Sequence, residues 1–155
     1  MVADLLAHYV SLSIRKALTD SALVTLIQVQ GHASPPAESV EEWLQFDLMA
    51  FNRRASRKNN WIGTVMFQVT SFSRMANQRQ DHEVNAPWIL SSHVRDLLAD
   101  HDLEVREYGE TGEALIATLE IGKEQSTYEK GLGASAASGA HAVVSVFSAT
   151  LVKTN

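Results

Sequence analysis

Histidine is the residue type in this chain with the widest chemical range, because an imidazole can bind a metal ion or act as a general base. The chain has His8, His32, His82, His93, His101 and His141. None belongs to an H-x-x-x-H pair or an HExxH sequence, the spacings that bring two imidazoles to one ion. His93 and His101 share a predicted helix but lie about 12 Å apart along its axis. We therefore expect no metal site.

A second candidate is the acidic group around His101. Asp100, Asp102 and Glu104 match the beginning of a calcium-binding loop. That loop also needs a glycine and a terminal bidentate glutamate at fixed positions, and both are missing. We interpret these residues as the solvated C-terminal end of a helix.

A third candidate is a glycine-rich segment from Gly131 to Ala136, which matches the dinucleotide-binding pattern G-x-G-x-x-A. That pattern binds phosphate only between a strand and a helix. Here it follows the charged sequence STYEK and precedes a β-branched run, which favours a flexible loop. The chain has no cysteine, no G-x-S-x-G sequence and no Walker sequence, so we expect neither an enzyme nor a cofactor.

The length and composition favour one folded domain. The chain has 155 residues, of which 45% are hydrophobic and 20% are charged, and we expect a single domain over residues 1–155. Its net charge of −5 argues against a duplex-binding protein, because affinity for phosphate requires clustered positive charge. With no signal-peptide pattern and no apolar run of bilayer length, we expect a protein made in the cytoplasm and independent of membranes.

Hydrophobic periodicity predicts the elements that would position any functional residue. Apolar residues at helical spacing predict a helix over residues 3–18. Alternating or β-branched residues predict strands over residues 23–30, 42–51 and 62–72, the last two forming a long hairpin around a polar loop at residues 52–60.

The second half repeats this grouping. Residues 74–85 are polar and aperiodic, which predicts a loop. Asn85 can then cap a helix over residues 87–101, with Pro87 in its first turn. Strands are predicted at residues 103–108, 113–122 and 141–152, with a polar loop at residues 123–140. Grouped strands and two principal helices indicate an α+β fold with a mostly antiparallel sheet.

Four of the 13 positive charges lie close together on the predicted hairpin loop, at Arg53, Arg54, Arg57 and Lys58. One interpretation is a solvated loop tip. The other is a docking loop for an acidic protein surface or for nucleic-acid phosphate, because arginine binds both with paired hydrogen bonds.

The predicted strands are apolar on both faces, which one domain cannot easily bury. This excess indicates either helices on both sheet faces or a subunit interface. The candidate interface residues are Trp43, Met49, Met66, Phe72 and Phe147.

This layout resembles the phage tail terminator family, the tail-completion subunits that join the head and tail of long-tailed phages. The features that carry the resemblance are the helix from Ala3 to Leu18, the hairpin arms WLQF (residues 43–46) and GTVMFQV (residues 63–69), the polar loop between them, the helix at residues 87–101 and a closing strand.

The resemblance implies a homohexameric ring in the virion, at the junction of tail and neck. Its partners would be other copies of the chain, the major tail tube protein and a neck or connector protein. DNA would pass through the ring without sequence-specific binding. The family has no catalytic residues to transfer.

Three alternatives stay open at this point. One is another neck or tail-completion protein of similar fold. Another is a small-ligand enzyme or binding domain that uses His93, His101 or the Gly131 loop. The third is a nucleic-acid-binding factor that uses the basic loop.

Overall fold

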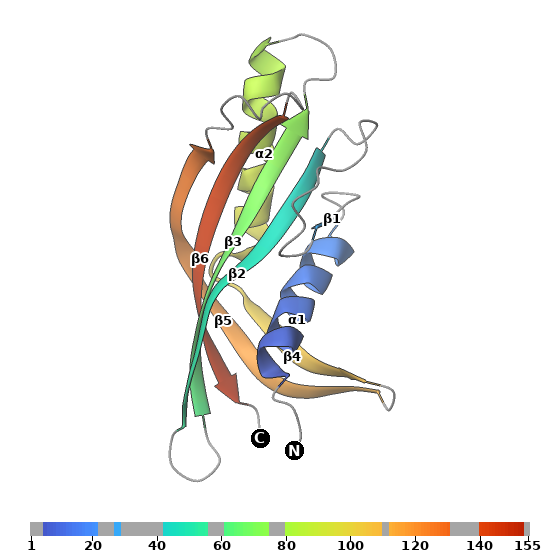
Figure 1. Ribbon diagram of the computed structural model, residues 1–155, viewed down its shortest axis with the longest axis vertical. Helices are drawn as coiled ribbons and strands as arrows, with labels where there is room; N and C mark the ends of the chain where they lie inside the picture. Colours follow the sequence, from blue (N-terminus) through green and yellow to red (C-terminus); the bar gives the residue numbers. More distant parts are fainter. Residues whose placement is uncertain are drawn as a thin grey trace.

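A computed structural model of the chain describes residues 5–21, 27–28, 42–55, 61–74, 80–109, 112–130 and 140–153. Within these residues it has two helices and six strands (Figure 1). The helices are α1 (Leu6–Asp20) and α2 (Gln80–Leu98). The strands are β1 (Ile27–Gln28), β2 (Glu42–Ala55), β3 (Trp61–Arg74), β4 (Asp102–Gly109), β5 (Gly112–Lys130) and β6 (Ala140–Lys153). This confirms the predicted order of elements.

The six strands form one sheet in the order β1-β2-β3-β6-β5-β4. Only the β1–β2 pair is parallel, and every other neighbouring pair is antiparallel. The strands curve strongly, and at one end the β2–β3 pair diverges from the β4–β5 pair (Figure 1). The α+β class is therefore confirmed in its broad form, although strands contribute more of the fold than helices.

Alternation along the central strands gives the sheet one strongly apolar face. Leu48, Phe67 and Phe147 lie opposite one another on β2, β3 and β6. Phe67 stacks on Phe147 with ring centroids 5.3 Å apart, and Phe46 contacts Phe67 at 5.8 Å. Both helices pack on this face, because their buried side chains belong to the same core: Leu6, Val10, Ile14 and Leu18 from α1, and Leu90, Val94 and Leu98 from α2.

The first helix is displaced by two or three residues from the predicted range of 3–18. Thr19 and Asp20, which lie outside the predicted range, form its last residues. The Thr19 hydroxyl donates to the Arg15 carbonyl at 2.8 Å, and Lys16 pairs with Asp20 at 3.3 Å. These i,i+4 contacts support one more turn, and the chain becomes extended at Ser21.

The second helix contradicts the prediction at both ends. Residues 80–85, predicted as loop, are helical, so Asn85 is no cap and Pro87 lies inside the helix. Figure 1 shows the first turns of α2 extending beyond the end of β3. The helix ends at Leu98 instead of residue 101, because Asp100 adopts a left-handed conformation with φ of 57°.

Two predicted loops are partly strand. Residues 52–55 continue β2, with Asn52 opposite Thr64, and residues 123–130 continue β5. The β5–β6 register shifts between Ile121 and Glu124 and again between Glu124 and Ser126, and such bulges break the alternation that reveals a strand. Residues 56–60, 75–79 and 131–139 of the predicted loops lie outside the described residues, as does most of the predicted strand at 23–30.

Replacing Phe67 with alanine is expected to destabilise the protein by about 3–5 kcal/mol, because the ring is fully buried between two others. Urea unfolding followed by circular dichroism measures this change. Met49→Ala is the control, since half of the Met49 surface is exposed (50%), and it should shift stability by less than about 0.5 kcal/mol. Equal effects of the two substitutions would contradict this core.

Candidate assembly surfaces

The face of the sheet opposite the helices, called the outer face here, has a mixed polar and apolar surface. Its rows follow from the strand register: Gln45, Thr70 and Val144 form one, and Ala50, Met66 and Ser148 another. Asp47 and Gln68 lie opposite each other between these rows. The side-chain amides of Gln45 and Gln68 donate to the Asp47 carboxylate at 3.1 and 3.3 Å. This face is therefore more polar than the face under the helices.

Two of the five predicted interface residues pack against each other on the outer face. Trp43 and Phe72 are register partners, and their rings stack at 4.8 Å with an interplanar angle of 3°. Trp43 is only 2% exposed, while Phe72 is partly buried. In this fold the two rings therefore stabilise the sheet itself.

Met49 and Met66 present more surface. The β2–β3 register shifts between Leu48 and Ala50, so Met49 is the extra residue of a bulge and is 50% exposed. Met66 is partly buried beside Ala50 on the outer face. Of the proposed interface residues, Met49 is therefore the most accessible.

Phe147 must be reassigned. It is fully buried, stacks on Phe67 and belongs to the core shared by both helices. Phe147 lies on a strand that is apolar on both faces. Such a pattern does not indicate which face the helices cover, so the sequence could not place Phe147 in the core. Phe147 thus has no exposed surface for a partner in this fold.

The sequence analysis missed a different apolar pair. Ile62 on β3 and Val152 on β6 lie opposite each other and are 52% and 36% exposed. Both alternate with core residues, Ile62 with Gly63 and Val152 with Leu151, so strand alternation alone places them on the outer face. That alternation was the signal that would have found them.

The basic cluster begins next to this apolar pair. Arg53 lies opposite Gly63 and is exposed, and Arg54 lies opposite Ile62. The side chain of Arg54 and all of Arg57 and Lys58 lie outside the described part of the structure.

Gly63 lies where three strands pack closely. A Cβ atom at this position would lie 3.3 Å from the Asn52 carbonyl oxygen and 3.3 Å from the Leu151 Cβ, so glycine suits this packing.

Two stretches of strand have a neighbour on one side only within the described residues. β1 covers β2 only at Leu44 and Gln45, so the rest of β2 pairs with β3 alone. On the other side of the sheet, β4 pairs with β5 no further than Glu120, so β5 from Glu124 onward pairs with β6 alone. An unpaired strand edge is a surface to which another strand can add.

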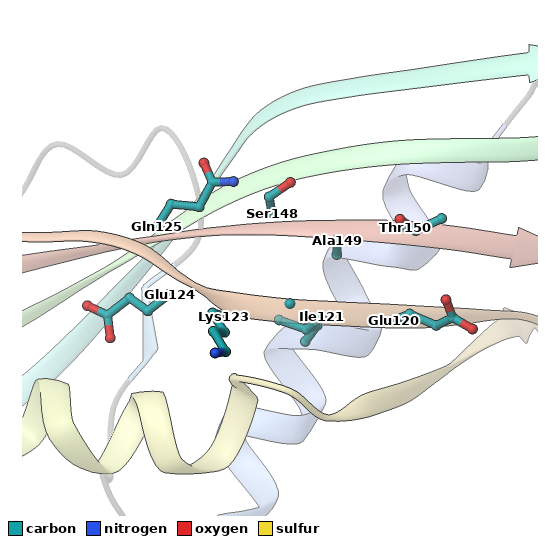
Figure 2. A pocket seen from close by; sticks show the side chains of 9 residues that line it. Glu120, Ile121, Lys123, Glu124, Gln125, Ser148, Ala149 and Thr150 are labelled. Atoms are coloured by element: carbon teal, nitrogen blue, oxygen red, sulfur yellow. The ribbon is translucent and has the colours of Figure 1, made fainter.

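A pocket of about 570 Å³ lies at the bulged part of β5, lined by residues 120–125 and 148–150. Figure 2 shows Gln125 and Ser148 on one side of the strand, with Lys123 and Glu124 on the side where α2 runs. Both Glu124 carboxylate oxygens are buried and have no hydrogen-bond partner among the described residues. Burial raises the Glu124 pKa above its ordinary value of 4.5, while Arg95 and the Ser145 hydroxyl oppose that rise.

The residues considered for metal or ligand chemistry do not converge in the described structure. His93 and His101 are exposed, and the His101 Nδ1 lies 2.8 Å from the Ala99 carbonyl oxygen. Glu104 pairs with Arg106. Among the described residues no cluster of three or more metal-binding side chains occurs, and no helix has the length and apolarity to cross a membrane. The Gly131 segment lies outside the described residues.

Comparison with solved structures gives a match over the whole chain. A chain from the "Virion of native gene transfer agent (GTA) particle" aligns with a TM-score of 0.56 and 15% sequence identity, covering 98% of this chain and 100% of that one. The likeness is one of fold. A second solved protein, described only by a sequence identifier, aligns with a TM-score of 0.53 and 13% identity over 96% of each chain. No protein-family model and no curated protein matches the sequence.

If the Trp43–Phe72 stack stabilises the subunit, Phe72→Ala should lower the free energy of unfolding by about 1–3 kcal/mol, since it removes apolar contact and a ring pair. Phe72→Leu, which keeps most of the apolar area, should cost less. Urea unfolding and sedimentation are measured together. Unchanged stability with altered association would instead make Phe72 an interface residue.

Proposed function

We propose that this chain is a structural virion protein of a phage-like particle, acting as a tail terminator subunit. In this role copies form a ring that caps the tail tube and joins it to the neck on the head side. The observation that carries the proposal is the agreement in fold, over nearly all of both chains, with a component of a gene transfer agent virion. The protein would have no catalytic activity.

The two strand edges that have no neighbour among the described residues support a ring. They lie on opposite sides of one sheet, on β2 and on β5. If the β2 edge of one copy meets the β5 edge of the next, every copy uses both edges in the same way, which is a heterologous contact. Such contacts close into a ring when the rotation between copies allows it, and a homohexamer is the state that the family resemblance implies.

Exposed apolar residues would complete the contacts between copies or with the tube. Met49 and Met66 are retained from the sequence analysis, and Ile62 and Val152 join them. The basic residues Arg53, Arg54, Arg57 and Lys58 would dock an acidic surface of a tube or neck protein. DNA would pass through the lumen without sequence-specific contact, consistent with the net charge of −5.

Analytical ultracentrifugation tests the ring. The purified protein should sediment as a hexamer, either alone at high concentration or after addition of the tube or neck protein. Ile62→Ser combined with Val152→Ser should weaken association without unfolding, because both side chains are exposed. Thr64→Ser, a conservative exposed change on the same strand, is the control. If the wild-type protein stays a monomer both alone at high concentration and after addition of the tube or neck protein, the ring is ruled out.

Serine at Arg53, Arg54, Arg57 and Lys58 should abolish docking onto the tube or neck protein and leave the circular dichroism spectrum unchanged. Pull-down and surface plasmon resonance measure the docking. A control with lysine at the three arginine positions keeps the charge and should retain part of the affinity. Full docking by the serine variant would remove these residues from the mechanism, and equal affinity of the wild type for duplex DNA would favour the nucleic-acid alternative.

A further inference from the structure

Glu124 occupies an unusual place in the sheet. It lies between the two register shifts of β5 and opposite Phe147, a core residue, so its side chain is on the helix side of the sheet. Figure 2 shows it on the side where α2 runs. Both carboxylate oxygens are buried and have no well-formed hydrogen bond among the described residues, so their lost hydration makes the ionised form costly.

The groups around Glu124 compensate for this cost only in part. From α2, Arg95 attracts the carboxylate, but it is exposed and donates to the Ser92 hydroxyl at 3.1 Å. From β6, the Ser145 hydroxyl favours the charged form, yet it is 2.6 Å from the Ser91 hydroxyl and shares a hydrogen bond with it.

Two described charged side chains of β5 near Glu124 are exposed. Lys123 is exposed at the pocket, and Glu129 accepts a hydrogen bond from Trp88. On α2, Asp96 is exposed. Among the described residues, Arg95 is therefore the cation that acts on Glu124.

Helix α2 is attached to β5 on both sides of Glu124. At one end the Trp88 indole donates to Glu129 at 2.8 Å. At the other, the Asp100 amide donates to the Gly122 carbonyl at 3.1 Å, and the Ile121 amide donates to the His101 carbonyl at 3.0 Å. Glu124 lies between these hydrogen bonds, beside a helix that packs mainly on β3 and β6, so a change in its charge acts at the β5 margin of the helix–sheet contact.

The packing under this part of α2 is also less apolar than under the rest of the core. Ser91 on the helix meets Ser145 on β6, and the buried Ser71 hydroxyl on β3 has no hydrogen-bond partner among the described residues. Small polar side chains bury little apolar area, so less free energy opposes a local separation here than at the Phe67 stack.

We propose that Glu124 is a proton-controlled release point, at which ionisation of the carboxyl group loosens the contact between α2 and the bulged part of β5 and protonation tightens it. With Glu124 ionised, α2 could separate from the bulged part of β5 while the aromatic core stays intact. It does not depend on the proposed role in a virion.

The sign of the effect follows from proton linkage. Below the ordinary pKa of 4.5, Glu124 is protonated in both the closed and the opened states, so it contributes no pH dependence. Above that value, the opened state loses its proton more readily than the closed state, whose pKa is raised by burial. The closed state therefore loses stability as the pH rises from 4.5 through the raised pKa, and the loss is complete above it.

Hydrogen exchange with mass spectrometry tests this proposal, using protection factors corrected for the intrinsic pH dependence of exchange. In the wild type, protection at residues 91–98 and 123–127 should fall several-fold between about pH 4.5 and about pH 8. Glu124→Gln should keep protection high across that range and raise the urea midpoint at neutral pH. Glu120→Gln, which changes an exposed carboxylate lining the same pocket, should behave as the wild type.

Protection of residues 91–98 that does not change with pH in the wild type would overturn the proposal. So would a pH dependence that persists in Glu124→Gln, or one that Glu120→Gln removes equally well. Arg95→Gln gives a further measure: loss of the compensating cation should lower protection above pH 4.5 and leave it unchanged below. A uniform loss at every pH would show that Arg95 acts only through packing.

Discussion

The Phe67 ring stacks on Phe147 and meets the tilted ring of Phe46, and these contacts hold three neighbouring strands in one register, around which the rest of the fold is arranged. A shift of one residue in any of these strands would turn its ring to the outer face, so the aromatic contacts specify the pairing. Both helices then cover the same face, because that is where the apolar surface lies. The outer face is exposed at Ile62 and Val152 but buried at Thr70 and Val144.

The elements that could be predicted from the sequence are those whose side chains meet the core. The central strands alternate around Val65, Phe67 and Val69, and α1 repeats an apolar residue every three or four positions. The segments missed obey other constraints. Residues 80–85 belong to a helix, and their polar sequence has no apolar periodicity that would reveal it. Residues 123–130 form a strand in which two bulges interrupt the alternation, and Asp100 ends α2 by a backbone conformation that residue type only weakly favours.

The sequence predicted that apolar surface would remain, but it did not identify which apolar residues are exposed. A strand such as β6 is apolar on both faces, and only the position of the helices separates Phe147 in the core from Val152 at the surface. Trp43 was predicted as an interface residue, but its register partner Phe72 stacks on it within the same chain. An apolar residue can therefore be assigned to an interface only when it is known which side chains of the same chain already pack against it. Glu124 could not be found by pattern at all, since its environment depends on two bulges and on α2.

The distribution of stability in this chain suits a subunit that completes its contacts by assembly. Apolar area and ring stacking are concentrated at the centre of the sheet, and the less satisfied groups lie toward its margins: the unpaired lengths of β2 and β5, the exposed Ile62–Val152 pair and the buried carboxylate of Glu124. A neighbour that adds a strand to an open edge satisfies backbone groups that water otherwise solvates, and it restrains the strand to which it binds. Glu124 lies on the length of β5 that has β6 as its one neighbouring strand among the described residues. A strand added on the other side would restrain the same segment whose contact with α2 depends on the charge of Glu124. Edge pairing and the seating of α2 are therefore expected to be energetically coupled, and by reciprocity each would stabilise the other.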